Sequence, residues 1–343
     1  MTKIAINGFG RIGRNFLRQI LNYPEIEVVA INDLGSVENL AYLFKYDSVY
    51  GRYHKETKLK GEGTSKCCLA VGEKEILFLQ EKDPTKLPWK ELGIDIVIES
   101  TGFFTSFEKS KVHLDTGAKR VVISAPAKDD DGDLGKTVLA GINEEALNSC
   151  MISSTGSCTT NGVSPVMAIL SENPGIKKAI LNTAHAYTAT QKVVDGLGEK
   201  KDMRSGRAAA INIIPGSTGA AMSMIRALPE LEGKFDGIAL RVPVPTGSIA
   251  DVTFVSARPT SVEEINKILT DASKSEKWQG IMGVTNEPLV SSDIIGEALP
   301  ALVDLSYTRV VDGDLVKVLV WYDNEGGYIT ALVRQVLAVA KLL

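Results

Sequence analysis

Short apolar runs alternate with helical patterns in the first part of the chain. Strands are predicted at 3–7, 27–32, 94–100 and 120–126. Helical spacing of apolar residues is found at 16–23, at 36–46 after a Ser36 cap, and at 107–118. Strands that alternate with helices are typical of a doubly wound parallel sheet. We therefore predict an α/β domain with such a sheet over roughly the first 150 residues.

The pattern changes after a predicted helix at 158–172. Longer runs of alternating apolar and polar residues are found at 178–188, 237–246, 248–257 and 314–323. Such runs are typical of an antiparallel sheet with one covered face. An amphipathic helix is predicted at 328–343, and the acidic run 129–131 is interpreted as a solvated loop. The later part of the chain is thus predicted to be an α+β domain with a mostly antiparallel sheet.

Composition and charge exclude several classes of protein. The 343 residues carry a net charge of −4, which weighs against a dedicated nucleic-acid binder. No apolar run is long enough to span a membrane, and the N-terminus lacks a signal-peptide pattern, so we predict a cytoplasmic location. The four cysteines and three histidines do not have the spacing of zinc ligands, and we expect no metal site.

A glycine-rich motif follows the first predicted strand. Gly8, Gly10 and Gly13 form G-x-G-x-x-G at the start of a helix. The first glycine permits a tight turn, the second lets a pyrophosphate approach the backbone, and the third lets the helix pack on the strand. Asp33 ends the second strand, where a carboxylate accepts both ribose hydroxyls of an adenosine. The pattern predicts a Rossmann-type domain that binds NAD in preference to NADP.

Cys158 is the strongest candidate for a nucleophile. It lies between Ser157 and Thr159, in the first turn of a predicted helix, where the helix dipole favours a thiolate. The alternative, a small buried core cysteine, is the usual role of this residue type. That alternative suits Cys67, Cys68 and Cys150, but the polar neighbours of Cys158 argue against it there.

His185 lies inside a predicted strand, where a lone histidine is more often structural. Polar groups that suit a phosphate or a sugar follow it in the segment 187–191. Arg241 and the pair Thr218–Gly219 are further candidates for anion binding. Taken singly, Arg241 is better interpreted as a surface salt bridge and Thr218–Gly219 as a turn.

The motifs together resemble one enzyme family. INGFGRIGR, INDL, STGFF, VISAPA, SCTTN, HAYTATQ, STGAA, RVPVP and WYDNE occur in order from residue 6 to residue 325. This series is similar to the phosphorylating glyceraldehyde-3-phosphate dehydrogenases. The resemblance implies an NAD-binding domain at 1–157, completed by the C-terminal helix 325–343, a catalytic domain at 158–324, and a homotetramer. It also implies oxidation of D-glyceraldehyde 3-phosphate to 1,3-bisphosphoglycerate with NAD and inorganic phosphate, through a cysteine thioester.

The resemblance also assigns residues by position. It implies that Cys158 is the nucleophile and His185 the general base. The implied site for the substrate phosphate comprises Thr188, Thr190 and Arg241. The implied site for inorganic phosphate comprises Ser157, Thr159, Thr218 and Gly219. The implied cofactor contacts are Gly8, Gly10, Arg11, Ile12, Gly13, Asp33, Ser124 and Asn324, with Asn324 facing the nicotinamide carboxamide.

The sequence departs from the family pattern at a few positions. Gly162 replaces a second cysteine, Gly326 a tryptophan, Met222 a lysine and Leu197 a proline, and the segment between Asp195 and Arg204 is longer by about one residue. Three alternatives remain beside the main interpretation. A dehydrogenase for erythrose 4-phosphate would lack the TATQ threonines, and an enzyme that uses water as acyl acceptor would not need Thr159 and Thr218–Gly219. A non-catalytic binding protein would have lost Cys158 or His185.

Overall fold

The computed structural model describes residues 1–64, 67–198 and 202–343, and the chain divides into two compact units. The first unit comprises Met1–Val138, Glu144–Gly156 and Leu332–Leu343. The second unit comprises Leu139–Asn143 and Ser157–Ala331. None of the helices in the described ranges has the length and apolar character that a membrane span requires.

The first unit is built on a nine-stranded sheet with the order β10-β11-β9-β8-β1-β2-β7-β6-β5. Its pairs from β10 to β7 are parallel, and β5 and β6 add antiparallel pairs at one edge. The strands are β1 (Thr2–Asn7), β2 (Ile26–Asn32), β5 (Thr57–Lys60), β6 (Cys68–Val71), β7 (Lys74–Leu79), β8 (Ile96–Glu99), β9 (Arg120–Ile123), β10 (Gly135–Thr137) and β11 (Ile152–Ser154). The predicted doubly wound sheet is confirmed.

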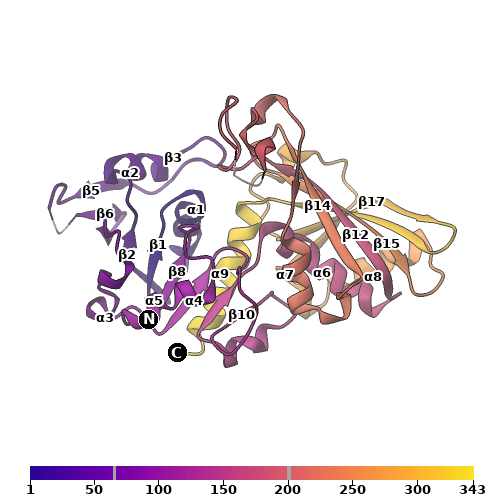
Figure 1. Ribbon diagram of the computed structural model, residues 1–343, viewed down its shortest axis with the longest axis horizontal. Coiled ribbons are helices and arrows are strands. Elements are labelled where there is room, and N and C mark those ends of the chain that lie inside the picture. The colour runs from indigo at the N-terminus through magenta and orange to yellow at the C-terminus, as the bar shows by residue number, and fades with distance from the viewer. Residues whose placement is uncertain (65–66, 199–201) are drawn as a thin grey trace. The chain divides into compact units, whose positions relative to one another are not determined.

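Helices connect the parallel strands of the first unit, as Figure 1 shows. They are α1 (Arg11–Ile20), α2 (Val37–Lys45), α3 (Trp89–Leu92), α4 (Phe107–Ser110) and α5 (Val112–Asp115). The Ser36 cap of α2 is confirmed, because its hydroxyl accepts from the Asn39 amide at 3.2 Å. The helix predicted at 107–118 is instead two single-turn helices, α4 and α5, which are separated at Lys111.

The acidic run 129–131 is a loop, as predicted, but it is not simply solvated. Asp129 accepts from the backbone amides of Phe107 and Glu108 and thereby caps α4. Asp131 accepts from the amide and the hydroxyl of Thr137, at the end of β10. These carboxylates therefore satisfy backbone donors that would otherwise lack a partner.

The second unit contains a seven-stranded sheet with the order β13-β14-β12-β15-β18-β17-β16. Only the pairs β12–β14 and β16–β17 are parallel, so the predicted mostly antiparallel sheet is confirmed. The strands are β12 (Ile176–Ala186), β13 (Ile214–Ser217), β14 (Phe235–Val242), β15 (Ser248–Ser256), β16 (Met282–Thr285), β17 (Ala301–Val311) and β18 (Leu315–Tyr322). Every second residue of β15 is buried, which matches a sheet with one covered face.

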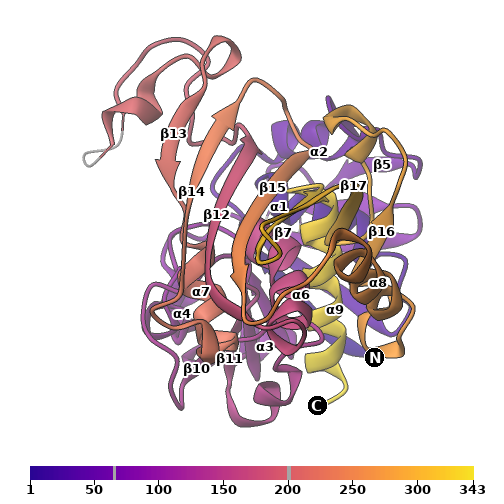
Figure 2. The ribbon, with the colours of Figure 1, turned by 90° about the vertical axis from the view of Figure 1, so that its right-hand side faces the viewer.

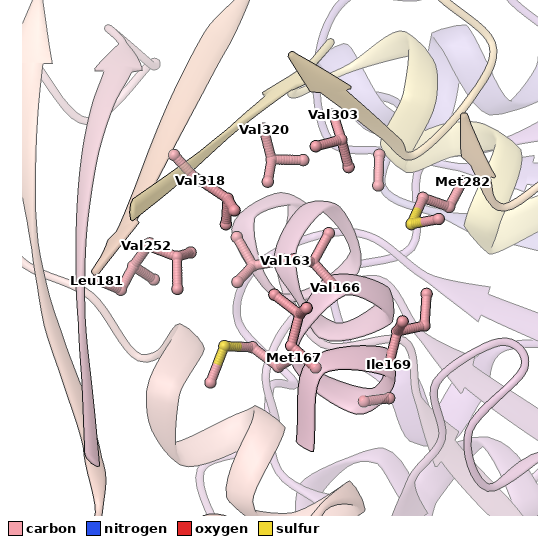
Figure 3. Close-up of a cluster of buried hydrophobic side chains, with 14 of the residues drawn as sticks. Val163, Val166, Met167, Ile169, Leu181, Val252, Met282, Val303, Val318 and Val320 are labelled. Atoms are coloured by element: carbon pink, nitrogen blue, oxygen red, sulfur yellow. The ribbon is translucent and has the colours of Figure 1, made fainter. Parts of the chain in front are cut away.

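Three helices, α6 (Cys158–Glu172), α7 (Ala220–Ala227) and α8 (Val262–Ser273), pack against this sheet (Figure 2). Figure 3 shows the resulting core, in which Val163, Val166 and Met167 of α6 face Val318 and Val320 of β18. All five side chains are fully buried. The helix predicted at 158–172 has the bounds that the pattern indicated, and this core fixes its position.

The last helix, α9 (Gly326–Ala340), begins two residues before its predicted start. The buried Asp323 carboxylate accepts from the amides of Glu325 and Gly326 at 2.9 Å, which caps the helix at Gly326. A second oxygen of Asp323 accepts from the Gly296 amide. Asp323 thus holds the backbone next to Asn324 in place.

Replacement of Met167 by alanine tests the α6 core. Met167 is fully buried, so Met167→Ala is expected to lower the free energy of unfolding by about 2–5 kcal/mol. Met151 is 46% exposed, and Met151→Ala removes the same atoms at a cost of only about 0.5 kcal/mol. Denaturant unfolding of both variants measures the difference, and equal losses would contradict the core described for α6.

Candidate active site and cofactor pocket

A cavity of about 450 Å³ in the first unit lies where three neighbouring parallel strands end. Asn7 ends β1, Asn32 ends β2, and Ser100 and Thr101 directly follow β8. In doubly wound sheets, ligands bind at the carboxyl ends of the strands, at a reversal of strand order. The cavity lining also includes Gly8, Gly10, Asp33, Leu34, Phe103 and Phe104.

The three motif glycines have distinct steric environments. Gly8 has φ +98°, and a Cβ there would lie 2.5 Å from the Thr101 nitrogen. A Cβ at Gly13 would lie 2.1 Å from the Gly8 oxygen, so only glycine permits this close packing. Gly10 precedes α1 and has open space on its side-chain face. A helix start with free space before it suits an anion such as a pyrophosphate.

Asp33 lies on the cavity wall, and backbone donors fix its carboxylate. One oxygen accepts from the Phe9 amide at 2.6 Å, and the other accepts from the Gly35 amide at 2.8 Å. Each carboxylate oxygen retains a lone pair for a further donor. The geometry is therefore compatible with the ribose contact that the sequence suggests.

A buried polar network beneath the cavity was not predicted from the sequence. The Glu99 carboxylate accepts from Asn7 Nδ2 at 2.7 Å and from the Thr101 amide at 2.8 Å, and it lies 3.1 Å from His113 Nε2. Trp89 Nε1 donates to His113 Nδ1, so the imidazole hydrogen resides on Nε2 and points to Glu99. The network holds Asn7 and Thr101 in the cavity wall. The sequence feature that could have indicated this network is the position of Asn7 and Glu99 at the ends of two strands.

Five of the proposed cofactor residues, Gly13 among them, do not line the described cavity. Arg11 pairs with Asp47 at 2.6 Å, and Ile12 lies in the first turn of α1. Ser124 follows β9 and donates its hydroxyl to the Glu99 carbonyl at 3.0 Å. Asn324 belongs to the second unit, where its side-chain oxygen accepts from Thr246 and Ser248. This arrangement orients the Asn324 NH₂ group as a donor.

In the second unit, Cys158 and His185 lie in contact. The distance from Cys158 Sγ to His185 Nε2 is 3.2 Å. Cys158 is the first residue of α6, and Ser157 caps that helix by accepting from the Thr160 amide at 3.0 Å, while Thr160 reciprocates. His185 lies near the end of β12 and is 4% exposed.

Burial dominates the protonation of this pair. It raises the pKa of the Cys158 thiol, while the positive charge of Arg241 and hydrogen bonds from Thr159 act in the opposite direction. Burial and Arg241 lower the pKa of His185 to about 3. Burial thus disfavours the charged form of each side chain and opposes the thiolate that the helix dipole alone would favour.

Arg241 lies beside the far nitrogen of His185. Its Nη1 is 2.7 Å from His185 Nδ1 and 3.2 Å from the Ala186 carbonyl. The parallel register of β12 and β14 places Arg241 opposite His185. The interpretation of Arg241 as a surface salt bridge is therefore wrong.

The other proposed anion-binding residues lie in the second unit, each with local hydrogen bonds of its own. The hydroxyls of Thr188 and Thr190 are 3.0 Å apart in the segment after β12. Thr218 accepts from the Ala220 amide through its hydroxyl, and Gly219 directly precedes α7. The hydroxyl of Ser157 already serves the cap of α6.

Tyr322 is a site residue that sequence reasoning missed. Its hydroxyl lies 2.9 Å from Thr159 Oγ1 and 2.7 Å from Thr183 Oγ1, and its ring meets His185 edge-on at 6.0 Å. A Cβ at Gly162 would lie 3.0 Å from the Tyr322 ring. Gly162 therefore leaves room for this ring next to the catalytic pair. The motif WYDNE, which contains Tyr322, was the sequence feature that could have indicated a role for this residue.

Of the remaining departures from the family pattern, Gly326 begins α9 and donates its amide to Asp323, next to Asn324. Met222 is exposed on α7, and Leu197 is 92% exposed. The segment between Asp195 and Arg204 includes residues 199–201, which lie outside the described residues.

A dinucleotide-type pocket on a doubly wound sheet and a cysteine–histidine pair on a second unit are features of a two-domain dehydrogenase. Family models agree: "Glyceraldehyde 3-phosphate dehydrogenase, NAD binding domain" matches residues 2–107, and the C-terminal domain of the same family matches 157–324. The chain belongs to the glyceraldehyde-3-phosphate dehydrogenase family, and its cofactor is NAD.

Relatives that are similar to this chain over almost their whole length carry the name of this family. Glyceraldehyde-3-phosphate dehydrogenase of Clostridium pasteurianum is 47% identical, covering 100% of this chain and 99% of the relative. The enzyme of Zymomonas mobilis is 44% identical over 99% of both chains. That of Geobacillus stearothermophilus is 45% identical, covering 95% of this chain and 94% of the relative.

The carboxylate of Asp33 is expected to set the preference for NAD over NADP. Charge repulsion between the Asp33 carboxylate and a 2′-phosphate about 4 Å away would weaken binding by at most about 4 kcal/mol. Half of that loss already corresponds to a more than about tenfold weaker affinity. Asp33→Asn removes the charge but keeps one acceptor for the Phe9 amide. This variant should therefore show a smaller preference for NAD over NADP. The control Asp133→Ala changes an exposed carboxylate and should leave that preference unchanged. Catalytic efficiencies with NAD and NADP measure this; equal efficiencies in the unmodified enzyme would refute the role of Asp33.

Proposed function

We propose that this chain catalyses the NAD-dependent, phosphorylating oxidation of D-glyceraldehyde 3-phosphate. The observation that carries the proposal is the contact of 3.2 Å between Cys158 Sγ and His185 Nε2. A thiol beside a base, with a cationic group next to it, suits covalent catalysis on an aldehyde that bears a phosphate. The product is the acyl phosphate 1,3-bisphosphoglycerate.

The first step forms a bond between sulfur and the aldehyde carbon. His185 accepts the Cys158 proton at Nε2 as the sulfur attacks and passes it to the aldehyde oxygen, which gives a hemithioacetal and leaves His185 neutral again. Bound NAD supplies the acceptor for the hydride that leaves this carbon. His185 then takes the hydroxyl proton, and a thioester on Cys158 remains. Attack of inorganic phosphate on the thioester releases the acyl phosphate and returns the thiolate, which recovers its proton.

Two anion sites are needed for this sequence, one for each phosphate. We assign the substrate phosphate to Arg241, Thr188 and Thr190, because a guanidinium and paired hydroxyls offer several donors. We assign inorganic phosphate to Ser157, Thr159, Thr218 and Gly219. The start of α7 at Gly219 supports the second assignment, since the N-terminus of a helix attracts anions.

The cofactor is assigned chiefly to the first unit. Gly8, Gly10 and Asp33 line the cavity. We assign the nicotinamide carboxamide to the Asn324 NH₂ group, because the Asn324 oxygen already accepts from Thr246 and Ser248. Arg11, Ile12, Gly13 and Ser124 complete the proposed set. These assignments correspond to a cofactor domain at 1–157 with the helix 325–343, and a catalytic domain at 158–324.

A homotetramer and a cytoplasmic location are further parts of the proposal. Val193, Val194, Met203 and Ile211 are each at least 73% exposed in the second unit, and such apolar side chains suit contact with another subunit. All four cysteines are free thiols, which suits a reducing compartment.

One assay tests the proposed function directly. NADH formation is measured with glyceraldehyde 3-phosphate, with and without inorganic phosphate. Continuous turnover only with phosphate supports the proposal, because the thioester then needs phosphate as its acceptor. Equal rates without phosphate would indicate water as the acceptor, and faster turnover of erythrose 4-phosphate would indicate the sister activity.

Replacement of Cys158 by serine is expected to abolish turnover while NAD binding remains. A serine hydroxyl is far less acidic than a thiol, so attack on the aldehyde fails. Cys68→Ser, at a partly exposed position outside the site, serves as the control and should keep most activity. The measurement is NADH formation together with NAD titration. Near-normal turnover in Cys158→Ser would refute the nucleophile.

Replacement of His185 by asparagine is expected to slow the hydride-transfer burst by roughly 10²–10⁴-fold, as loss of a general base does. His54→Asn, at an exposed position, should leave the burst unchanged. Rapid-mixing measurement of the first turnover isolates this step from phosphate attack. A burst of normal rate in His185→Asn would exclude His185 as the base.

A further inference from the structure

The side-chain oxygen of Asn324 faces two buried hydroxyl groups. Asn324 Oδ1 lies 2.9 Å from Ser248 Oγ and 3.1 Å from Thr246 Oγ1, and all three residues are buried. The oxygen and nitrogen ends of an asparagine side chain have nearly the same shape, so hydrogen-bond partners decide which end faces which neighbour. The orientation of Asn324 therefore depends on what these two hydroxyls are able to donate and to accept.

Ser248 is satisfied by only one orientation of Asn324. The backbone amide of Ala186 donates to Ser248 Oγ at 3.0 Å, and an amide nitrogen has no other role than that of donor. The single hydroxyl hydrogen of Ser248 then needs an acceptor, and within the described part of the chain Asn324 Oδ1 is the acceptor in reach. If the NH₂ group of Asn324 faced Ser248 instead, this buried hydrogen would have no partner, which native structures rarely tolerate.

Thr246 is compatible with both orientations of Asn324. Its hydroxyl also lies 2.9 Å from Asp323 Oδ1, a carboxylate oxygen that accepts in either case. When the Asn324 oxygen faces Thr246, the hydroxyl donates to one of the two oxygens. When the Asn324 NH₂ group faces Thr246, the hydroxyl donates to Asp323 and accepts from the NH₂ group. The hydrogen of Thr246 thus has an acceptor in both cases, and Ser248 alone decides the orientation.

This orientation decides which half of a carboxamide the site is able to bind. With its oxygen turned to Ser248, Asn324 offers the hydrogens of its NH₂ group, and a carbonyl oxygen is the matching partner. In the reverse orientation Asn324 would offer an acceptor, and the matching partner would be the NH₂ group of the carboxamide. The two orientations therefore predict opposite responses to changes in the ligand.

We propose that Ser248 is a positioning residue that orients Asn324, so that the enzyme recognises the carbonyl oxygen of the nicotinamide carboxamide and not its NH₂ group. Ser248 also links this orientation to the end of β12, the strand that carries His185, through the Ala186 amide. The inference rests on the proposed function, since it takes Asn324 as the partner of the nicotinamide.

Two cofactor analogues distinguish the two halves of the carboxamide. The 3-acetylpyridine analogue of NAD keeps the carbonyl oxygen and has a methyl group in place of NH₂. The thionicotinamide analogue keeps the NH₂ group and has sulfur, a weak acceptor, in place of the oxygen. In calorimetric titrations of the unmodified enzyme, we expect the thionicotinamide analogue to bind about tenfold more weakly than the 3-acetylpyridine analogue, as loss of one hydrogen bond does. Equal or tighter binding of the thionicotinamide analogue would overturn the proposed orientation.

Ser248→Ala removes the hydroxyl that selects the orientation. Asn324 is then able to turn toward either analogue, so the tenfold difference between the analogues should fall below about threefold. Thr246→Val removes the other hydroxyl at the same oxygen, and as the matched control it should keep the full difference. A general loosening of the fold would weaken the binding of both analogues alike and leave their ratio unchanged. An unchanged ratio in Ser248→Ala, or an equal fall in Thr246→Val, would overturn the role of Ser248.

Neutron diffraction from deuterium-exchanged crystals of the unmodified enzyme tests the orientation without a ligand or a variant. We expect the deuterium of Ser248 Oγ to point at Asn324 Oδ1, and a deuterated NH₂ group of Asn324 facing Ser248 would contradict the inference.

The titrations also separate this inference from the proposed function, because they need no aldehyde. Binding of NAD without discrimination between the analogues overturns the role of Ser248 and leaves the proposed function intact. Absence of NAD binding overturns both.

Discussion

The contact between Cys158 and His185 depends on a helix start and a strand end that are held side by side. Ser157 and Thr160 cap α6 reciprocally, so Cys158 has a fixed backbone position. The valines of α6 pack against β18, which fixes the helix on the sheet (Figure 3). β12 lies between β14 and β15, so His185 is placed by a strand with neighbours on both sides. The packed core therefore maintains the distance of 3.2 Å between Cys158 Sγ and His185 Nε2.

The burial that fixes this distance also disfavours the charged forms of Cys158 and His185. It raises the pKa of Cys158 and lowers the pKa of His185. Arg241 introduces a permanent positive charge at the opposite side of the imidazole.

Local signals account for most of what could be predicted from the sequence. The glycine motif, the Ser36 cap and the helix at 158–172 depend on residues that are near one another in the chain. The strand β17 was missed, because its first five residues are all buried and lack alternation. The bond between Thr159 and Tyr322 joins residues 163 positions apart, and the network of Glu99 and His113 depends on several strands meeting at one edge. Such contacts form only when segments that are distant in the sequence come together in the fold, so no local sequence pattern predicts them.

Oxidation of the aldehyde is expected to leave an acyl group on Cys158. The enzyme is mixed with glyceraldehyde 3-phosphate and NAD in the absence of inorganic phosphate, quenched with acid, and analysed by peptide mass spectrometry. We expect a phosphoglyceroyl thioester on the peptide that contains Cys158, which disappears when phosphate is added before the quench. NADH formation without this adduct, or an adduct on another residue, would exclude a thioester on Cys158.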